Sequence, residues 1–375
     1  MKPLKVMTIV GTRPEIIRLS EVIKTLDLHF NHILVHTGQN WDYTLNEIFF
    51  KELALRAPNY YLNCPGQNLG ATIGNIISHT YDILLKEQPD ALLVLGDTNS
   101  ALSAIAAKRL KIPIFHMEAG NRCFDENVPE EINRKLVDHI SDINLPYTEH
   151  SRRYLLAEGF RKEHIFVTGS PIPEVLQRHL PSIQQSTVLE QLGLNPQGYI
   201  LVSAHREENI DQEAAFFSIM NALNAIATTY NLPIIYSTHP RSQRFIDQRK
   251  FSFHLLVKNL KPLGFFDYNK LQQNAFCVLS DSGTLSEEAA LLGFCGVLIR
   301  TSTERPEVLD KGSIIIGGIT ESSILQAIDL SRSMQHTTKD LHLPLDYMDV
   351  NVSIKIAKLI QSYTPIINQR IWHKT

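Results

Sequence analysis

Three carboxylates in the first half of the chain stand where they could move protons. Asp97 closely follows the apolar run 91–95, Glu118 follows the run 113–116, and Glu130 comes shortly after. Ligands of open α/β sheets bind beyond the carboxyl ends of parallel strands, and carboxylates held there can act as general acids and bases. One acid at one strand end is easily structural, whereas three together favour acid–base chemistry.

Each acid also has a structural alternative. Asp97 or Thr98 is a plausible helix N-cap, and Glu130 is spaced i, i+4 from Arg134, so that the two can pair on a helix. The His-x-Glu sequence at 116–118 resembles half of a zinc deaminase signature. Because no Pro-Cys-x-x-Cys follows it, we predict no metal site.

Arginines and two strand-to-helix turns favour a bound diphosphate. The turns at 11–15 and 280–284 each open a helix, whose first N–H groups suit an anion. The arginines that add positive charge are Arg13, Arg18, Arg206 and Arg305. A capped helix with two solvated arginines is the alternative for the first turn.

The second half has its own polar residues at strand ends. His205 follows the run 199–203 and is available for proton transfer, and His239 follows the run 233–237. A hydrogen-bonded structural histidine is the alternative for both. A carboxylate one turn into the helix after 280–284 suits ribose hydroxyls. Candidate ligands around this turn are Ser282, Gly283, Thr284 and Glu288.

The elements that must position these residues form two series. In the first, apolar runs at 6–10, 32–37, 91–95 and 113–116 alternate with helical stretches at 14–26, 69–85 and 100–110. In the second, runs at 199–203, 233–237, 276–279 and 296–299 accompany a helix at 211–230. Continuous apolar strands separated by helices are typical of parallel sheets covered on both faces. We therefore expect an α/β fold of two Rossmann-like, doubly wound domains.

The domain boundary is expected in the region that holds 169–173 and a polar stretch at 184–187. Another break at 335–349 precedes a last helix at about 351–363. Because ligands bind beyond strand ends, two such domains predict an active-site cleft where both sets of ends meet.

Composition excludes several classes of protein. A formal net charge of -3 gives no sign of a nucleic-acid partner. The four cysteines include no Cys-x-x-Cys pair and indicate reduced thiols of a cytoplasmic protein. The N-terminus does not resemble a signal peptide, and no stretch has the length needed to cross a membrane.

The distribution of charge suggests the ligand. The arginines and helix N-termini suit a diphosphate, while the three acids lie in the other domain and suit a neutral polar group such as a sugar. A nucleotide sugar fits this division, and stabilising the leaving diphosphate would be the main electrostatic task.

Six short motifs occur in the order found in the non-hydrolysing UDP-N-acetylglucosamine 2-epimerases, and the sequence resembles that family over essentially its whole length. The motifs are GTRPE (11–15), GDT (96–98), HxEAGxR (116–122), PEExNR (129–134), DSG (281–283) and TERPE (303–307). The sequence is similar in particular to the UDP-N-acetyl-L-fucosamine synthases of capsule and O-antigen pathways. The segments that carry this finer resemblance are 38–40, 116–125, 203–209 and 264–268.

The family implies a GT-B-like fold whose C-terminal helix returns to the first domain, so we expect domains of 1–170 plus about 357–375, and 171–356. It implies elimination of UDP, a 2-acetamidoglycal and re-addition of UDP, with no cofactor. The finer branch converts UDP-2-acetamido-2,6-dideoxy-L-talose to the L-fuco sugar. A homodimer is expected from the resemblance alone.

The resemblance also implies residue roles. The acid–base carboxylates are Asp97, Glu118 and Glu130, and His205 assists near the diphosphate. Arg13 and Arg18 steady the departing UDP. The residues that hold UDP are Ser282, Gly283, Glu288 and Arg305.

The sequence departs from the family at several places. Arg18 replaces the usual lysine, which keeps the charge but changes its geometry. Residues 38–42 differ in a region that forms part of the family's allosteric site, Thr284 replaces a common glycine, and 169–171 reads Gly-Ser-Pro. The rival functions are a hydrolysing epimerase and a GT-B glycosyltransferase, which both predict release of UDP, and a binding protein without catalysis, which has no need of three acids.

Overall fold

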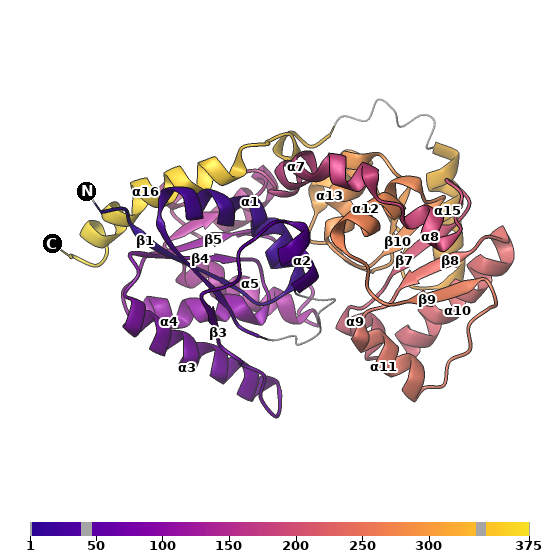
Figure 1. Cartoon of the computed structure of the whole chain (residues 1–375), viewed down its shortest axis with the longest axis horizontal. Helices are drawn as coiled ribbons and strands as arrows, with labels where there is room; N and C mark the ends of the chain where they lie inside the picture. The colour runs from indigo at the N-terminus through magenta and orange to yellow at the C-terminus, as the bar shows by residue number, and fades with distance from the viewer. Residues whose placement is uncertain (1, 39–46, 335–342, 375) are drawn as a thin grey trace. The chain divides into compact units, whose positions relative to one another are not determined.

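The computed structural model describes residues 2–38, 47–334 and 343–374. The chain folds into two compact units (Figure 1). Unit 1 comprises Met1–Arg178 and Leu345–Thr375, and unit 2 comprises His179–Pro344. Each unit contains one parallel six-stranded sheet with helices, which confirms the predicted α/β fold of two Rossmann-like domains.

The sheet of unit 1 has the strand order β3-β2-β1-β4-β5-β6. Its strands are β1 (Lys5–Val10), β2 (Asn31–His36), β3 (Tyr60–Tyr61), β4 (Ala91–Leu95), β5 (Ile114–Met117) and β6 (Ile143–Leu145). The direction of winding reverses between β1 and β4, which pair in parallel. In doubly wound sheets ligands bind beyond the carboxyl ends of the strands at this switch point.

Helices of unit 1 pack around this sheet in two groups. They are α1 (Arg13–His29), α2 (Glu47–Glu52), α3 (Leu69–Glu87), η2 (Asn99–Ser103), α4 (Ala104–Arg109), α5 (Pro129–Ile140), α6 (Glu149–Ala157), η3 (Lys162–His164), η5 (Leu345–Tyr347) and α16 (Val352–Arg370). Helices α3, α4 and α5 pack in succession, and α1 packs against α16. These helices cover the strand side chains, of which Met7, Leu92 and Val94 are fully buried.

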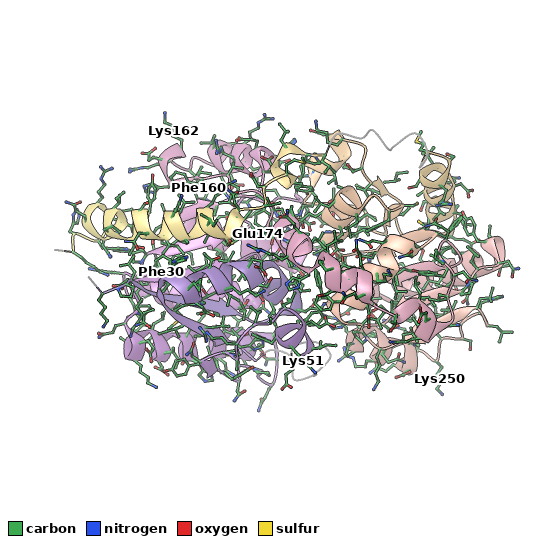
Figure 2. The ribbon with its side chains drawn as sticks, turned by 45° about the horizontal axis from the view of Figure 1, so that its top comes forward. Phe30, Lys51, Phe160, Lys162, Glu174 and Lys250 are labelled. Atoms are coloured by element: carbon green, nitrogen blue, oxygen red, sulfur yellow. The ribbon has the colours of Figure 1, made fainter. Side chains whose placement is uncertain are left out.

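The last helix is anchored to unit 1 by hydrogen bonds. Glu174, which is labelled in Figure 2, lies near the start of α7 (Ile172–Gln185). It accepts hydrogen bonds from both the backbone N and the hydroxyl of Ser353. Lys355 Nζ donates to the carbonyl of Thr168 at 3.0 Å. The C-terminal segment therefore completes unit 1.

The sheet of unit 2 has the same winding, with the order β12-β11-β10-β7-β8-β9. Its strands are β7 (Ile200–Ser203), β8 (Ile234–Ser237), β9 (Val257–Leu260), β10 (Cys277–Ser280), β11 (Gly296–Leu298) and β12 (Ile315–Ile316). The switch point lies between β7 and β10, where Ser203 pairs with Ser280 in register.

The helices of unit 2 pack their apolar side chains into the core of that unit. They are α8 (Val188–Leu192), α9 (Glu207–Ile210), α10 (Glu213–Tyr230), α11 (Pro240–Gln248), α12 (Phe265–Asn274), α13 (Thr284–Leu292), α14 (Pro306–Asp310) and α15 (Glu321–Met334). In α10, Phe216, Ile219 and Leu223 repeat at helical spacing and are buried in the core that α10 shares with α15. Among the described residues, no helix is both long and apolar enough to cross a membrane.

The strands that the sequence did not reveal are the two at the edges of each sheet: β3, β6, β9 and β12. Edge strands are short or partly exposed, so they lack the continuous apolar pattern of central parallel strands. In β9, for example, Lys258 and Asn259 are exposed. The helix expected at 100–110 was wrong in detail, because its first turn is the 3₁₀ helix η2 and only Ala104–Arg109 is α-helical.

The two divisions of the chain lie within the regions in which the sequence suggested breaks, 169–187 and 335–349, and the domain limits at 170 and 356 stay a prediction. The division falls between Arg178 and His179, inside α7, and again between Pro344 and Leu345. The first division lies inside a continuous helix, so no change of hydrophobic pattern marks it in the sequence.

Candidate active site

A buried carboxyl group joins the two loops at the switch point of unit 1. Glu15 accepts hydrogen bonds from Gly11 N (3.1 Å) and Thr12 Oγ1 (2.8 Å), and its other oxygen bonds to Ser100 Oγ. Ser100 Oγ in turn lies 2.6 Å from Thr98 Oγ1. Burial raises the pKa of Glu15 to about 7, and the hydrogen bonds from Ser100 and Thr12 offset only part of that rise. Glu15 thus links the loops after β1 and β4 with a carboxyl group that titrates near neutral pH.

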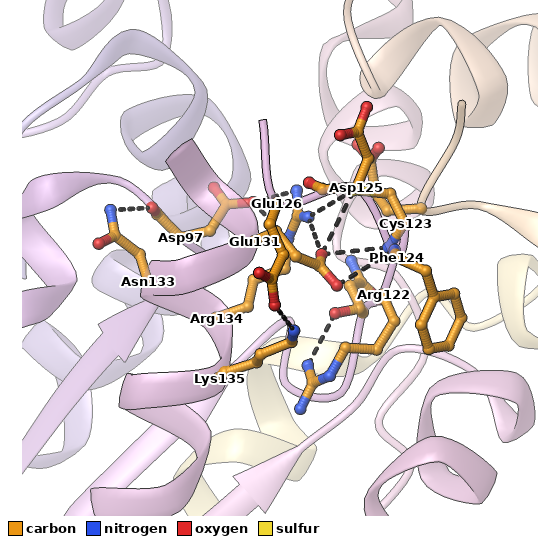
Figure 3. A network of polar contacts seen from close by, with 12 residues as sticks. Asp97, Arg122, Cys123, Phe124, Asp125, Glu126, Glu131, Asn133, Arg134 and Lys135 are labelled. Atoms are coloured by element: carbon orange, nitrogen blue, oxygen red, sulfur yellow. Dashed lines mark hydrogen bonds and ion pairs between the residues drawn. The ribbon is translucent and has the colours of Figure 1, made fainter. Parts of the chain in front are cut away.

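Asp97 is held by an arginine and is not a helix cap. Its Oδ2 accepts from Arg134 Nε at 2.8 Å and lies 2.6 Å from Arg134 Nη2, while Asn133 donates to its backbone carbonyl (Figure 3). Thr98, not Asp97, occupies the N-cap position of η2, and no side-chain capping bond forms there. The capping alternative for Asp97 is therefore wrong. Two donors of α5 fix this loop instead.

Arg134 is itself held by a second carboxylate, Glu131, in the same helix. Glu131 lies 2.8 Å from Arg134 Nη1 and also accepts from the backbone N–H groups of Cys123 and Phe124 (Figure 3). Burial would raise the pKa of Glu131, but the backbone N–H of Cys123 and the hydrogen bond and charge of Arg134 together lower it below its ordinary value. The described ion pairs of Arg134 are with Asp97 and Glu131, and its i, i+4 pairing with Glu130 stays a prediction.

Glu118 stands at a strained backbone position and pairs with Arg18. Its φ is +65°, in the left-handed region that non-glycine residues seldom occupy. Glu118 Oε2 lies 2.7 Å from Arg18 Nη1, and a Cβ at Gly96 would lie 3.2 Å from the same oxygen. The Arg18 side chain is only 5% exposed and its guanidinium carbon lies 5.7 Å from the centre of the Tyr147 ring. Arg18 is therefore not a solvated arginine.

The loop that carries Glu118 rests on a fully buried polar cluster. Asp138 lies 2.9 Å from His116 Nδ1 and 2.8 Å from Arg122 Nη1, and it accepts two hydrogen bonds from Gly120 N. Burial would raise the pKa of Asp138, but the hydrogen bond and charge of His116 and the charge of Arg122 lower it overall. His116 Nε2 also bonds to the carbonyl of Gly96. His116 thus has a structural role between the two acid-bearing loops.

The two remaining candidates of unit 1 lie on the same group of elements. Glu130 is half-buried in the first turn of α5, the helix that supplies both donors to Asp97. Arg13 begins α1, and its guanidinium carbon lies 5.8 Å from the centre of the Phe49 ring. The described contacts therefore place Asp97, Glu118 and Arg18 at one end of the sheet of unit 1, and the roles of Glu130 and Arg13 stay predictions.

At the switch point of unit 2, a buried aspartate organises the loop after β7. Asp281 is fully buried, and its Oδ2 accepts from the backbone N of His205 (2.8 Å) and of Arg206 (2.9 Å) and from Asn209 Nδ2 (3.1 Å). Its Oδ1 lies 3.4 Å from His205 Nδ1. Arg206 Nε completes the cluster by donating to the carbonyl of Asp281.

His239 makes the hydrogen bond expected from its structural alternative, and its role in holding UDP stays a prediction. Its Nδ1 accepts from Arg241 N at 3.2 Å and so caps α11. Its ring stacks on that of His205, with the centres 5.4 Å apart. The two histidines that follow neighbouring strands β7 and β8 are therefore in contact.

The turn at the start of α13 keeps its polar atoms together. Ser282 Oγ lies 3.0 Å from Thr284 Oγ1, and a Cβ at Gly283 would come within 2.5 Å of Glu304 Oε1. Glu288, one turn further, is largely buried and accepts from Gln272 Nε2 at 2.6 Å. Any larger residue at position 283 would therefore require the Glu304 side chain to move.

Arg305 lies inside unit 2 and pairs with a carboxylate. It is 1% exposed, and its Nη2 lies 3.6 Å from Glu287 Oε2. The other arginine of this region, Arg206, has its Nη2 3.5 Å from Glu304 Oε1. Both guanidinium groups are therefore positioned by acids of their own unit, and a role in holding UDP stays a prediction for each.

Sequence reasoning missed four residues that organise the site: Glu15, Glu131, Asp138 and Asp281. Glu15, Glu131 and Asp281 stand inside recognised motifs, but several partners of these four acids lie far along the chain. Ser100, for example, is 85 residues from Glu15. A signal did exist, because a carboxylate just after a buried strand has to find donors from a neighbouring loop. The segment 39–42, at which the sequence departs from the family's allosteric region, lies outside the described residues.

Comparison with known proteins points to one family. Residues 24–361 match the family model described as UDP-N-acetylglucosamine 2-epimerase. A structure of UDP-N-acetylglucosamine 2-epimerase from Rickettsia bellii is similar with a TM-score of 0.91 and 47% identity, over 99% of this chain and 100% of that chain.

Two further relatives differ in the sugar that they are named for. Methanocaldococcus jannaschii UDP-GlcNAc 2-epimerase, solved in complex with UDP-GlcNAc and UDP, has a TM-score of 0.90 and 33% identity, over 96% of this chain and 99% of that chain. The UDP-2,3-diacetamido-2,3-dideoxy-D-glucuronate 2-epimerase of Pseudomonas aeruginosa is 35% identical, over 86% of this chain and 91% of its own. The chain thus belongs to the UDP-N-acetylglucosamine 2-epimerase family and is an isomerase that inverts C2 of a UDP-sugar.

Proposed function

We propose that this enzyme converts UDP-2-acetamido-2,6-dideoxy-L-talose to UDP-N-acetyl-L-fucosamine, a precursor for capsule or O-antigen. The support for this sugar is the sequence of 38–40, 116–125, 203–209 and 264–268, which resembles the UDP-N-acetyl-L-fucosamine synthases. Interconversion of UDP-N-acetylglucosamine and UDP-N-acetylmannosamine is the second candidate, favoured by the 47% identity to the Rickettsia bellii enzyme.

Inversion at C2 requires removal of a proton that is only weakly acidic. C2 of the sugar is not next to a carbonyl, so its proton is not acidic enough to be removed on its own. In the proposed reaction a carboxylate takes the C2 proton, the electron pair forms the C1=C2 bond, and the bond from C1 to the UDP oxygen breaks. UDP then adds back to C1 while a proton is returned to C2 on the opposite face.

The observation that carries the proposed acid–base chemistry is the way in which Arg134 holds the Asp97 carboxylate. Within the described residues, every side-chain contact of that carboxylate falls on Oδ2, where Arg134 binds. The side chain is 20% exposed. Oδ1 is therefore available to exchange a proton with a ligand while the arginine fixes the direction of the group.

We further propose that Glu118 and Glu130 share the acid–base work with Asp97. UDP is held in unit 2 by the turn at 282–284 together with Glu288, Arg206, His239 and Arg305, and Arg13 and Arg18 supply positive charge for the leaving diphosphate. Positive charge and N–H donors aimed at the departing diphosphate stabilise the transition state. We also propose that the enzyme works as a cytoplasmic homodimer without a cofactor.

Incubation in D2O tests the reaction. With UDP-2-acetamido-2,6-dideoxy-L-talose, we expect solvent deuterium at C2 of the L-fuco product, while UDP stays attached to the sugar at equilibrium. Proton NMR of the C1 and C2 signals reads both the epimer ratio and the deuterium content.

A panel of UDP-sugars separates the candidates. Faster turnover of UDP-N-acetylglucosamine than of the L-talo sugar would assign the second candidate. Stoichiometric release of UDP would instead indicate a hydrolase or a glycosyltransferase. No deuterium uptake with any 2-acetamido UDP-sugar would contradict the proposed reaction.

A further inference from the structure

Two cysteines stand side by side at the amino ends of neighbouring strands in unit 2. Cys277 is the first residue of β10, and Cys295 directly precedes β11. These strands pair in parallel with Val278 opposite Gly296, and the N–H of Val278 donates to the carbonyl of Cys295 at 2.8 Å. The two cysteines are therefore the next pair in this register, and their side chains point to the same face of the sheet.

The thiols of this pair are in contact. Cys295 Sγ lies 3.4 Å from Cys277 Sγ. Neighbouring strands lie about 4.8 Å apart, which is within the Cα separations of about 4.4–6.8 Å that a disulfide spans. A bond between the two sulfur atoms therefore needs their side chains to turn, while the strands can stay paired. The other two cysteines, Cys64 and Cys123, belong to unit 1.

The two sulfur atoms differ in their access to small molecules. Cys277 has no exposed surface, whereas Cys295 is 4% exposed and lines a cavity of about 770 Å³ together with Ser331 and Arg332. This cavity lies at the amino end of the sheet, and the turn at 282–284 follows the carboxyl end of β10. A small oxidant that enters the cavity therefore meets Cys295 before Cys277.

The surroundings of Cys295 also favour its thiolate. Cys295 Sγ lies 3.1 Å from Ser331 Oγ. The hydrogen bond of Cys277, with that of Ser331 and the charge of Arg332, lowers the pKa of Cys295 despite its burial. Burial raises the pKa of the Cys277 thiol. Since the thiolate is the form that reacts with peroxides, Cys295 is the more reactive partner and Cys277 is placed to react second.

We propose that Cys277 and Cys295 are a redox pair that forms a reversible disulfide with hydrogen peroxide as the oxidant. The Cys295 thiolate attacks one peroxide oxygen, the O–O bond breaks, hydroxide leaves, and a sulfenic acid remains on Cys295. The Cys277 sulfur then attacks that sulfur, the S–O bond breaks, and the departing hydroxide takes the thiol proton and leaves as water. In sum, two thiols are oxidised to one disulfide while one hydrogen peroxide is reduced to two waters. The bond keeps Cys295 from irreversible oxidation.

Peptide mapping of the full-length enzyme tests the proposal. The folded protein is treated with hydrogen peroxide, its remaining thiols are alkylated in denaturant, and a digest without reducing agent is read by mass spectrometry. We expect a cross-linked peptide that joins Cys277 to Cys295, lighter by two hydrogen atoms than its two parts and lost after dithiothreitol. Recovery of both cysteines as alkylated thiols, or of Cys295 oxidised without a cross-link, would overturn the proposal.

Single serine variants separate the two roles. In Cys277→Ser the sulfenic acid on Cys295 has no partner, so dimedone should trap it, and longer treatment should add two or three oxygen atoms to Cys295. In Cys295→Ser, Cys277 should be oxidised at least about 10-fold more slowly than Cys295 in the first variant; an equal rate would overturn the assigned roles. Cys64→Ser removes a buried thiol of unit 1 and, as the matched control, should still form the cross-link. The wild-type mapping decides the proposal even if a variant fails to fold.

Discussion

Replacing Glu15 by glutamine should change how the stability of unit 1 depends on pH. The side chain is 1% exposed and burial raises its pKa from the ordinary 4.5 to about 7. Between these two pH values the folded protein keeps the Glu15 proton while the unfolded chain loses it. Stability contributed by this group is therefore fully present below pH 4.5 and declines as the pH rises toward 7.

The size of the effect follows from the shift in pKa. Each pKa unit corresponds to about 1.4 kcal/mol, so the shift from 4.5 to about 7 gives a full change of about 3.5 kcal/mol, of which about 2.5 kcal/mol falls between pH 5 and pH 8. Glutamine resembles the protonated carboxyl group, because its oxygen can accept from Gly11 N and its NH2 can donate to Ser100 Oγ. The variant should thus become more stable relative to wild type by about 2 to 3 kcal/mol from pH 5 to pH 8.

Urea unfolding at a series of pH values, followed by circular dichroism, measures this difference. All other titrating groups cancel when wild type and variant are compared at each pH. Glu213→Gln, at an exposed position in unit 2, is the matched control and should give a flat difference. A difference for Glu15→Gln that changes by less than about 0.5 kcal/mol over this range would refute the assignment of a raised pKa.

Four further substitutions test the contacts of unit 1. Asp97→Asn should lower kcat by about 100- to 10,000-fold and leave UDP affinity by calorimetry nearly unchanged; wild-type turnover would exclude Asp97 from proton transfer. Arg134→Lys keeps the charge but loses the paired contacts of Nε and Nη2 with Asp97, so kcat should fall at least about 10-fold, and an unchanged kcat would contradict the positioning. Asp138→Asn should destabilise unit 1 by about 3 kcal/mol in urea unfolding because it leaves a buried guanidinium and histidine without their shared carboxylate. Gly120→Ala adds a Cβ only 2.5 Å from the Ser151 carbonyl at a φ of +77°, so Tm should fall by several degrees; an unchanged Tm would contradict this geometry.

The sequence predicted the central strands well and the polar partners poorly, for a physical reason. Hydrophobic periodicity is local, so runs such as 91–95 identify a buried strand without knowledge of the rest of the fold. The partner of a charged group is not local: Arg18 meets Glu118 and Arg134 meets Asp97 only after the strands have paired. For this reason the solvated alternative for Arg18 and the capping alternative for Asp97 could be rejected only with the structure.

In both units a buried acid accepts hydrogen bonds from backbone N–H groups at the switch point of the sheet, but the acid differs: it is Glu15 in unit 1 and Asp281 in unit 2. At a switch point the crossover helices leave in opposite directions, so the loops after the two central strands separate and leave backbone N–H groups without sheet partners. In unit 1 the carboxyl of Glu15 accepts Gly11 N and reaches across to Ser100 beyond β4. In unit 2 the carboxylate of Asp281 accepts the N–H groups of two residues beyond β7. In both units the switch point therefore contains a buried acid that organises the surrounding loops. A catalytic site at this place then needs a neighbouring loop to direct a histidine or a second carboxylate toward the substrate.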